Sequence, residues 1–327
     1  MAAAVGADAG EMTTDELRSR GRALFPELSQ LGPSALERWP VPKHWPLAHG
    51  GALWVKRDDL LGEGGTKVRK LTVALARAQA SGRGLLTVGH LDSNHAPATA
   101  RAAALLGVPV ELALWGRPHS DPVRAVWLRS LAPVRFYSSA LGLVFGTAVR
   151  LWRARRQLDL FPPGGTTAVT TAAVALAVAE VVGQFEALGE PIPTRWAIAV
   201  GSGGSFAGLL AGARALGLSV AVTGVVASSR LLGRRREARL ANAALRLLGC
   251  TERVVAGDVK LQGRQAGAGH GVPTAASQAA ARELGALGHQ LDPIFTAKAM
   301  AEVAAASAPG ERWLFWHSGV AVSPPPG

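Results

Sequence analysis

A lysine near the start of a predicted helix is the first residue whose position points to chemistry. The glycine pair 64–65 lies just before it, and Arg69 and Lys70 follow Lys67 within one helical turn. A helix N-terminus carries partial positive charge, so a lysine there is electrostatically disfavoured. Positive neighbours and partial burial would lower the pKa of the Lys67 amine and make it nucleophilic. Taken alone, the motif is explained more simply by an exposed lysine that tolerates the helix dipole.

The second candidate is a glycine-rich turn between a predicted strand and a predicted helix. It consists of Gly201, Ser202, Gly203, Gly204 and Ser205. Glycines let the backbone approach an anion closely, and the N–H groups at the helix start then point at a phosphate. The turn lacks both the Lys-Ser/Thr ending of a nucleoside-triphosphate loop and the usual dinucleotide spacing. A tight turn without any ligand is the alternative.

Four polar residues, Asp92, Ser93, Asn94 and His95, follow another predicted strand and open the next helix. Ligands of open α/β sheets bind at this place. Hydroxyl, amide and imidazole groups could converge there on a carboxylate, although Asp92 or Ser93 could equally cap the helix without any function. The lysine and the glycine-rich turn together fit one ligand that has an aldehyde and a phosphate. The polar segment 92–95 fits an amino acid as substrate.

The elements that must position these residues alternate between strands and helices. Apolar runs predict strands over 53–56, 85–88, 110–115, 134–137, 196–200, 220–227 and 312–316. Helices are predicted over 67–80, 93–106, 121–131, 166–188 and 205–216. Such alternation indicates βαβ units. We therefore expect an α/β protein of two lobes, built from open twisted parallel sheets flanked by helices.

A proline-glycine break at 161–165 predicts a boundary between the lobes. The expected large domain comprises residues 1–70 and 166–327, and the expected small inserted α/β domain comprises residues 71–165.

Three further segments carry structural expectations. Four prolines within the first forty-two residues predict an irregular lead-in over about the first forty. The apolar stretches 140–149 and 172–182 are too short to span a bilayer and predict buried helices.

Composition narrows the class of protein. The 327-residue chain has a net charge of +12 and a single cysteine, Cys250. Disulfide scaffolding is therefore excluded, a cysteine-based metal site is not expected, and a reducing cytoplasm fits. The arginines at 230, 234, 235, 236 and 239 predict a solvated helix face, and no nucleic-acid motif accompanies them. We expect neither nucleic acid nor membrane as a partner.

Six segments, in this order, resemble the D-cysteine desulfhydrase and 1-aminocyclopropane-1-carboxylate (ACC) deaminase family. They are VKRDDLLGEGGTKVRKL (55–71), VGHLDSNHAPATARAAALLG (88–107), FPPGGTT (161–167), AVGSGGSFAGLLAG (199–212), DPIFTAKAM (292–300) and FWHSG (315–319). The resemblance implies an enzyme that depends on pyridoxal 5′-phosphate (PLP), with the tryptophan-synthase-β-like fold. It also implies a homodimer.

The resemblance further implies a role for each matching residue. Lys67 would hold the PLP aldehyde as a Schiff base and, with Ser93, would form the catalytic pair. Lys70 and the turn 201–205 would bind the phosphate, Asn94 the 3′-oxygen, and Ser318 the pyridine nitrogen. The implied substrate-binding residues are Ser93, Asn94, His95 and Phe295. Of these, Ser93 and His95 would form the corner that binds the substrate carboxylate and shuttles a proton.

Four departures from the pattern of that family are present. Thr66 stands where asparagine is usual, Asp92 where glutamine is usual, and Phe295 where tyrosine is frequent. The usual HTGG ending is HSGV. Phenylalanine neither donates nor accepts a proton, and this weakens the case for opening the ACC ring. A changed substrate or a reduced enzymatic activity stays open.

The expected reaction is α,β-elimination from a small amino acid. Lys67, once displaced from the cofactor, would act as the base at the α-carbon, and the ring would accept electrons. A serine at the pyridine nitrogen limits carbanion delocalisation and suits loss of a β-leaving group. D-cysteine, giving a keto acid, ammonia and sulfide, is the leading substrate. ACC deamination, another PLP reaction, or PLP binding with little turnover are the alternatives.

Overall fold

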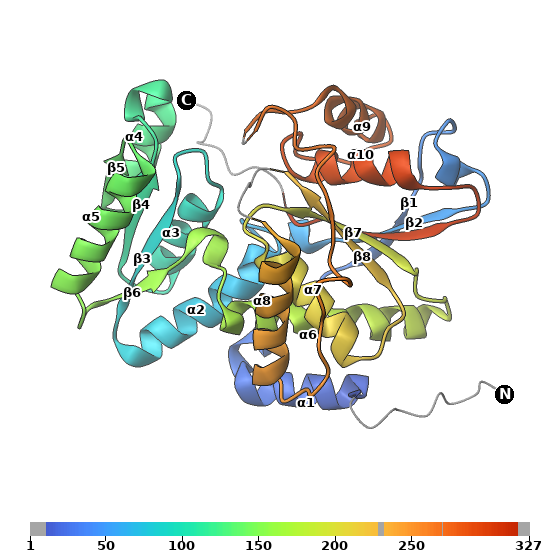
Figure 1. The fold of residues 1–327 in the computed structure, drawn as a ribbon, viewed down its shortest axis with the longest axis horizontal. Helices are drawn as coiled ribbons and strands as arrows, with labels where there is room; N and C mark the ends of the chain where they lie inside the picture. Colours follow the sequence, from blue (N-terminus) through green and yellow to red (C-terminus); the bar gives the residue numbers. More distant parts are fainter. Residues whose placement is uncertain (1–10, 228–231, 270, 320–327) are drawn as a thin grey trace.

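Residues 11–227, 232–269 and 271–319 are described in the computed structural model, and they form two lobes (Figure 1). The larger lobe contains a six-stranded sheet with the order β1-β2-β10-β7-β8-β9. Its strands are β1 (Leu36–Trp39), β2 (Ala52–Lys56), β10 (Arg312–Trp316), β7 (Arg195–Val200), β8 (Ala221–Val226) and β9 (Lys260–Gln262). Only the β1–β2 pair is antiparallel among these described strands.

The smaller lobe contains a four-stranded, entirely parallel sheet with the order β5-β4-β3-β6. Its strands are β3 (Gly84–His90), β4 (Val110–Trp115), β5 (Val134–Tyr137) and β6 (Leu158–Phe161). Parallel sheets flanked by helices in two lobes confirm the predicted α/β class. The domain boundaries at residues 70/71 and 165/166 stay a prediction.

Ten α-helices lie within the described residues. They are α1 (Thr14–Leu24), α2 (Lys67–Ser81), α3 (His95–Leu105), α4 (Pro122–Leu131), α5 (Ala140–Arg153), α6 (Ala168–Leu188), α7 (Gly204–Ala215), α8 (Arg234–Leu247), α9 (Ala275–Gly285) and α10 (Thr296–Ala306). Helices α1, α6, α7 and α8 cover one face of the large sheet, and α9 and α10 cover the other (Figure 1).

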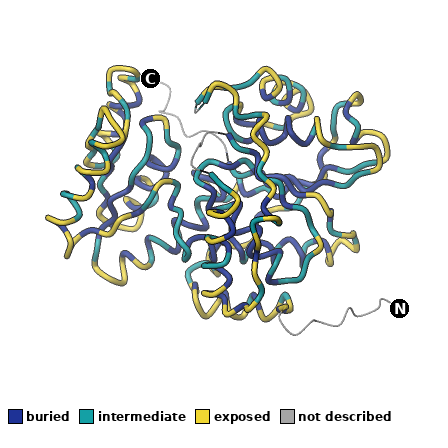
Figure 2. The backbone as a smooth tube through the Cα atoms, in the orientation of Figure 1, coloured by how far each residue is buried: buried dark blue, intermediate teal, exposed yellow. Residues whose placement is uncertain are grey.

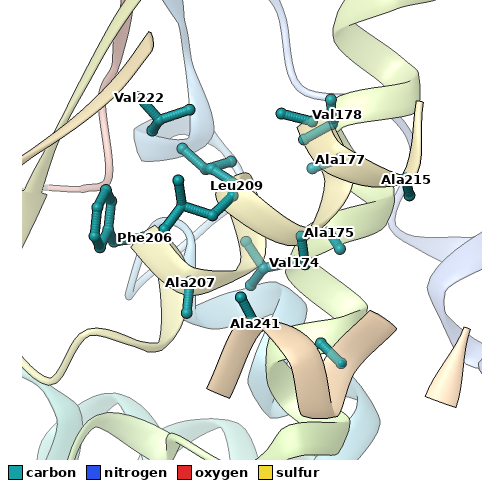
Figure 3. Packing of buried hydrophobic residues seen from close by; sticks show 14 of the residues in the cluster. Val174, Ala175, Ala177, Val178, Phe206, Ala207, Leu209, Ala215, Val222 and Ala241 are labelled. Carbon is teal, nitrogen blue, oxygen red and sulfur yellow. The ribbon is translucent and has the colours of Figure 1, made fainter. Parts of the chain in front are cut away.

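Close packing of α6 against α7 fixes the position of the glycine-rich turn. A Cβ on Gly208 would lie 2.7 Å from Val174 Cβ, and one on Gly212 would lie 2.4 Å from the Ala175 carbonyl oxygen. These two glycines, four residues apart on one face of α7, therefore let the helices approach closely. Figure 3 shows the small side chains of α6 and α7 interdigitating, with Phe206 and Leu209 against Val222. The N-terminus of α7 is held rigidly as a result.

Helix α6 is the one described helix whose length and composition would suffice to cross a membrane. However, 67% of its most apolar window is buried inside the protein. Its central residues, from Thr170 to Val182, pack between α1, α2, α7 and α8. The prediction of a buried helix over 172–182 is therefore confirmed.

The prediction of an irregular lead-in over the first forty residues is wrong for the part that the structure describes. Residues 14–24 form α1 and residues 36–39 form β1. A capping box starts α1: the Glu16 backbone N–H donates to Thr13 Oγ1 at 3.2 Å, and the Thr13 N–H donates to Glu16 Oε2 at 2.8 Å. The prolines that suggested irregularity lie outside both elements.

The prediction for residues 140–149 is correct for the helix and wrong for its burial. Helix α5 covers the outer side of the small sheet, and Thr147 is its one buried residue. Figure 2 shows this outermost part of the small lobe largely exposed. Apolar composition alone predicts that a helix packs against other residues, but it does not show which of its faces they cover.

The arginine cluster lies largely on α8. Arginines 234, 235, 236 and 239 are exposed there, as expected for a solvated helix face, and Arg230 lies outside the described residues. One of them has a further contact: Arg236 donates to the Ser202 carbonyl oxygen at 3.2 Å from both Nη1 and Nη2.

Candidate active site

A cavity of about 330 Å³ lies where the carboxyl ends of the strands of both sheets meet. Almost all predicted site residues line it. They are Lys67, Lys70, Ser93, Asn94, His95, Gly201, Ser202, Gly203, Ser205, Phe295 and Ser318. Gly204, the remaining predicted residue, is the first residue of α7 directly beside them. Residues distant in sequence thus converge on a single site.

Lys67 occupies the first position of α2 and is half-buried in the wall of the cavity. Burial lowers the pKa of its amine, and the nearby Asp292 carboxylate only partly opposes the shift. A larger neutral fraction makes this amine a better nucleophile towards a carbonyl group. The structure therefore gives Lys67 the environment that the sequence predicted.

A buried ion network anchors the first turn of α2. Arg69, 3% exposed, donates from Nη2 to Asp58 Oδ1 at 2.8 Å and from Nη1 to Glu180 Oε1 at 2.6 Å. Lys56 Nζ lies 3.1 Å from Glu180 Oε2. Two cations and two anions thus tie α2 to α6 and to the end of β2. This network fixes the backbone that carries Lys67.

The glycine-rich turn and Lys70 together form an anion cradle. A Cβ on Gly204 would lie 2.8 Å from Lys70 Nζ and 2.7 Å from Thr166 Oγ1, so only glycine lets these groups approach the helix start. Gly203 has φ +91°, a left-handed conformation that favours glycine. Burial and the charge of Lys67 lower the pKa of Lys70 to about 7. A bound phosphate would favour the protonated amine.

The hydroxyl of Ser93 accepts a hydrogen bond at the start of α3, and Ser93 also lines the cavity. Its Oγ accepts a hydrogen bond from the His95 backbone N–H at 3.2 Å. Arg124, 9% exposed, holds the preceding loop by donating to the carbonyl oxygens of Leu91 at 2.8 Å and Ser93 at 3.2 Å. Capping and ligand contact, which the sequence left as alternatives, are compatible in this geometry. Asn94 is the N-cap residue and faces the same cavity.

The imidazole of His95 lines the cavity and contacts two threonine hydroxyls of the small lobe. Its Nε2 contacts Thr87 Oγ1 at 3.0 Å and its Nδ1 contacts Thr99 Oγ1 at 3.3 Å, inside the small lobe. Burial, with the charges of Lys67 and Lys70, lowers its pKa to about 3. The ring is therefore neutral and engaged on both nitrogens. This arrangement suits a role in positioning the start of α3, and the proton-shuttle role of His95 stays a prediction.

Ser318 and the glycines before Lys67 fit against one another. The Thr66 N–H donates to the Ser318 carbonyl oxygen at 3.0 Å. A Cβ on Gly65, whose φ is +58°, would lie 2.2 Å from that oxygen, so the close contact requires glycine. The Thr66 hydroxyl is buried, lines the cavity and has no hydrogen-bond partner among the described residues.

His90, Trp115 and Asp292 are among the cavity-lining residues that sequence reasoning missed. His90 and Trp115 are the last residues of β3 and β4, and their rings meet edge to face at 5.3 Å. Their positions at the carboxyl ends of parallel strands could have identified them. Asp292 lies in the matched DPIF segment, and its Oδ1 accepts from the Ile294 N–H at 2.7 Å. Burial raises the pKa of this carboxyl group.

The residues present fit PLP. A desolvated lysine suits the aldehyde, and the turn with Lys70 suits the phosphate. The unpartnered Thr66 hydroxyl precedes Lys67 directly and offers a further polar contact. Among the described residues, no group of three histidine, cysteine, aspartate or glutamate side chains is placed to hold a metal ion.

Fold and site define an enzyme of the PLP-dependent class with two parallel-sheet lobes. Residues 32–319 match the family model described as "Pyridoxal-phosphate dependent enzyme", and the chain belongs to this family. PLP is accordingly its cofactor, as the sequence predicted.

Similar proteins agree with the family resemblance found in the sequence. A putative 1-aminocyclopropane-1-carboxylate deaminase of Pyrococcus abyssi is 32% identical over 286 residues, covering 83% of this chain and 84% of the relative. A D-cysteine desulfhydrase of Salmonella choleraesuis is 28% identical over 307 residues, covering 85% and 87%. The resemblance to this group of lyases and deaminases is therefore confirmed.

Solved structures support the same fold. An ACC deaminase homologue superimposes with a TM-score of 0.75 at 27% identity, covering 90% of this chain and 94% of that chain. A threonine deaminase superimposes with a TM-score of 0.64 at 23% identity, covering 96% and 100%. The likeness to the threonine deaminase concerns the fold alone.

Proposed function

We propose that this enzyme eliminates a β-leaving group from a small amino acid, with D-cysteine as the leading substrate. The observation that carries the proposal is the convergence of a desolvated Lys67 and a phosphate cradle on one cavity of about 330 Å³. A cavity of this size is typical of sites for small-molecule ligands. The products from cysteine would be a keto acid, ammonia and sulfide.

When bound, PLP supplies an electron sink for the bonds at the substrate α-carbon. Lys67 would hold the cofactor aldehyde and, when released by the substrate amine, would remove the α-proton because its pKa is lowered. Ser93 and Asn94 would bind the substrate carboxylate at the N-terminus of α3. Lys70 and the turn 201–205 would hold the phosphate.

Ser318, which lines the cavity, favours elimination over full carbanion chemistry. We propose that its hydroxyl faces the pyridine nitrogen, where a serine does not readily supply a proton. A good leaving group such as a thiolate would need less charge delocalisation than a poor one. Phe295, which lines the cavity, offers no proton to a poor leaving group.

ACC deamination is the second candidate, and the 32% identity to a putative ACC deaminase favours it. PLP binding with low activity is the third, because Phe295 replaces a frequent tyrosine. From the family resemblance we further propose a homodimer, and from the single cysteine a cytoplasmic location. We expect neither nucleic acid nor membrane as a partner.

The test is an assay of purified enzyme with PLP for keto acid, ammonia and sulfide. Substrates would be D-cysteine, L-cysteine, D-serine and ACC, and Lys67→Ala would control for free PLP chemistry. We expect keto acid and sulfide from D-cysteine in equal amounts, lost in Lys67→Ala. Keto acid from ACC alone would shift the assignment to ACC deamination. No keto acid from any substrate, with PLP bound, would refute elimination.

Phe295→Tyr is the matched variant for substrate choice. If the missing phenol limits ring opening, the tyrosine should raise ACC turnover while D-cysteine turnover changes little. An equal change for both substrates would show that residue 295 does not discriminate between leaving groups.

A further inference from the structure

Five ionisable side chains line the described part of the cavity, and four of them are already engaged. The five are Lys67, Lys70, His90, His95 and Asp292. Lys67 is assigned to the α-proton and Lys70 to the phosphate. The Asp292 carboxylate accepts hydrogen bonds from two backbone N–H groups, at 2.7 and 3.4 Å. His95 is neutral at pH 7, because its pKa is about 3. His90 is thus the one group of the five to which no role has been assigned.

The imidazole of His90 is held beside the indole of Trp115. The two residues end β3 and β4 and are partners in the parallel ladder, so their side chains project from the same face of the small sheet. Their rings meet edge to face, with centroids 5.3 Å apart and planes at 86°. The His90 side chain is 35% exposed, so it can also exchange protons with solvent.

Asp92 offers Nδ1 of the His90 ring a partner in either protonation state. Its Oδ2 lies 3.2 Å from Nδ1, and its backbone nitrogen lies 3.3 Å from the same atom. A protonated Nδ1 donates to the carboxylate, whereas an unprotonated Nδ1 accepts from the backbone N–H. A carboxylate at one ring nitrogen is the arrangement that orients catalytic imidazoles, and proton transfer to a substrate then falls to the other nitrogen, Nε2.

We propose, on the basis of the elimination proposed above, that His90 is the acid that protonates the leaving group. The substrates then include β-hydroxy amino acids such as serine, whose hydroxide needs a proton in order to depart. Phe295 cannot supply that proton, although it lines the same cavity. Ser93, three residues after His90, is the proposed carboxylate contact, so a small amino acid bound there lies near the imidazole.

The step balances without an oxidant or a reductant. Lys67 takes the α-proton, and the Cβ–O bond of serine breaks with its electron pair on oxygen. The proton on Nε2 of His90 then completes a water molecule. Both side chains return to their starting protonation states by exchange with solvent. Water hydrolyses the unsaturated product to a keto acid and ammonia, so the water lost in the elimination is regained.

Steady-state kinetics of the PLP-bound enzyme with two substrates tests the role of His90. Serine needs a proton for its leaving hydroxide, whereas β-chloroalanine loses chloride without one. Both are used in the handedness that the wild type accepts, and keto acid is measured. We expect the wild type to turn over both. His90→Gln should lower kcat/KM for serine about 100-fold or more, and that for β-chloroalanine by less than about threefold.

Further variants separate an acid from a structural residue. His119→Gln is the matched control, because His119 is exposed on the same lobe and lines a separate surface pocket. It should leave both substrates unaffected. Asp92→Asn should lower serine turnover less than His90→Gln does and should spare β-chloroalanine, as expected of a positioning residue. Added imidazole should restore serine turnover to His90→Ala. Unchanged circular dichroism and PLP absorbance would show that the variants retain the site.

The outcomes distinguish this role from the proposed elimination itself. A wild type that accepts β-chloroalanine but not serine would overturn the role of His90 and leave elimination intact. Equal losses for both substrates in His90→Gln would also overturn it. So would a selective loss of serine turnover in Asp292→Asn while His90→Gln keeps wild-type rates, which would make Asp292 the acid. A wild type that releases keto acid from neither substrate would refute the elimination as well.

Discussion

Replacing Asp58 by asparagine tests whether the buried ion network holds the reactive lysine in place. Asp58 is fully buried, and its carboxylate accepts from Ser34 Oγ at 2.7 Å, Arg69 Nη2 at 2.8 Å and Trp316 Nε1 at 2.8 Å. Asparagine keeps the volume but removes the charge opposite Arg69. Breaking a buried pair costs about 3–5 kcal/mol. Because Glu180 still pairs with Arg69, we expect about 3 kcal/mol.

The pH dependence of this loss has a defined sign. Burial raises the pKa of Asp58, but the Arg69 guanidinium and the hydrogen bonds outweigh it and hold the pKa below 3.8. A carboxylate of this kind contributes stability above its unfolded-state pKa and loses it as pH falls through the folded-state pKa. The difference between wild type and variant should therefore be complete at pH 7 and shrink below about pH 4.

Urea unfolding followed by circular dichroism measures this free energy, and PLP titration measures the effect on the site. Asp15→Asn is the control, because Asp15 forms an exposed ion pair with Arg18 and should change stability by less than about 0.5 kcal/mol. A loss under about 1 kcal/mol for Asp58→Asn at pH 7 would refute a network of this strength. So would a loss that stays constant down to about pH 3.

Three further predictions concern the cavity. Lys70 has a pKa of about 7, and phosphate favours its protonated form, so PLP affinity should fall by up to about tenfold per pH unit above that value. Lys70→Met should weaken binding and abolish this dependence in PLP titrations. Gly204→Ala should lower PLP affinity about tenfold or more, because the new methyl group would displace Lys70 Nζ or Thr166; equal affinity would contradict the cradle. Because the pKa of His95 lies near 3, its imidazole ¹⁵N shifts should stay constant from about pH 5 to 8, and a titration in that range would contradict its engaged, neutral state.

Most of the strands could be predicted because buried parallel strands are continuous apolar runs. Predicted strands 110–115, 134–137 and 312–316 coincide with β4, β5 and β10. Helix α1 was missed because its sequence is polar and prolines follow it, although Thr13 and Glu16 form a capping box that was available as a signal. The exposure of α5 could not be predicted, because hydrophobicity alone does not show whether other parts of the fold cover a helix.

The parts of the site that could be predicted are those where few other residue types would serve. Glycines before a lysine and glycines before a helix have few structural substitutes, and the lysine and the glycine-rich turn both proved to line the cavity. The orientation of His95 could not be predicted, because Thr87 and Thr99, which engage its two nitrogens, reach it only in the folded small lobe. His90 and Trp115 carry no local motif and depend on where their strands end.

Helix α2 connects the chemistry to both lobes, and this explains why its first turn is so strongly held. Val73 belongs to the core of the large lobe, whereas Leu71, Leu75 and Ala78 belong to the core of the small lobe. The helix is therefore apolar on two sides, and Lys67 and Lys70 lie at its end within the cavity. A displacement of this helix would move both amines. The Arg69 network opposes that displacement, because it joins α2 to the large lobe beside Lys67 itself.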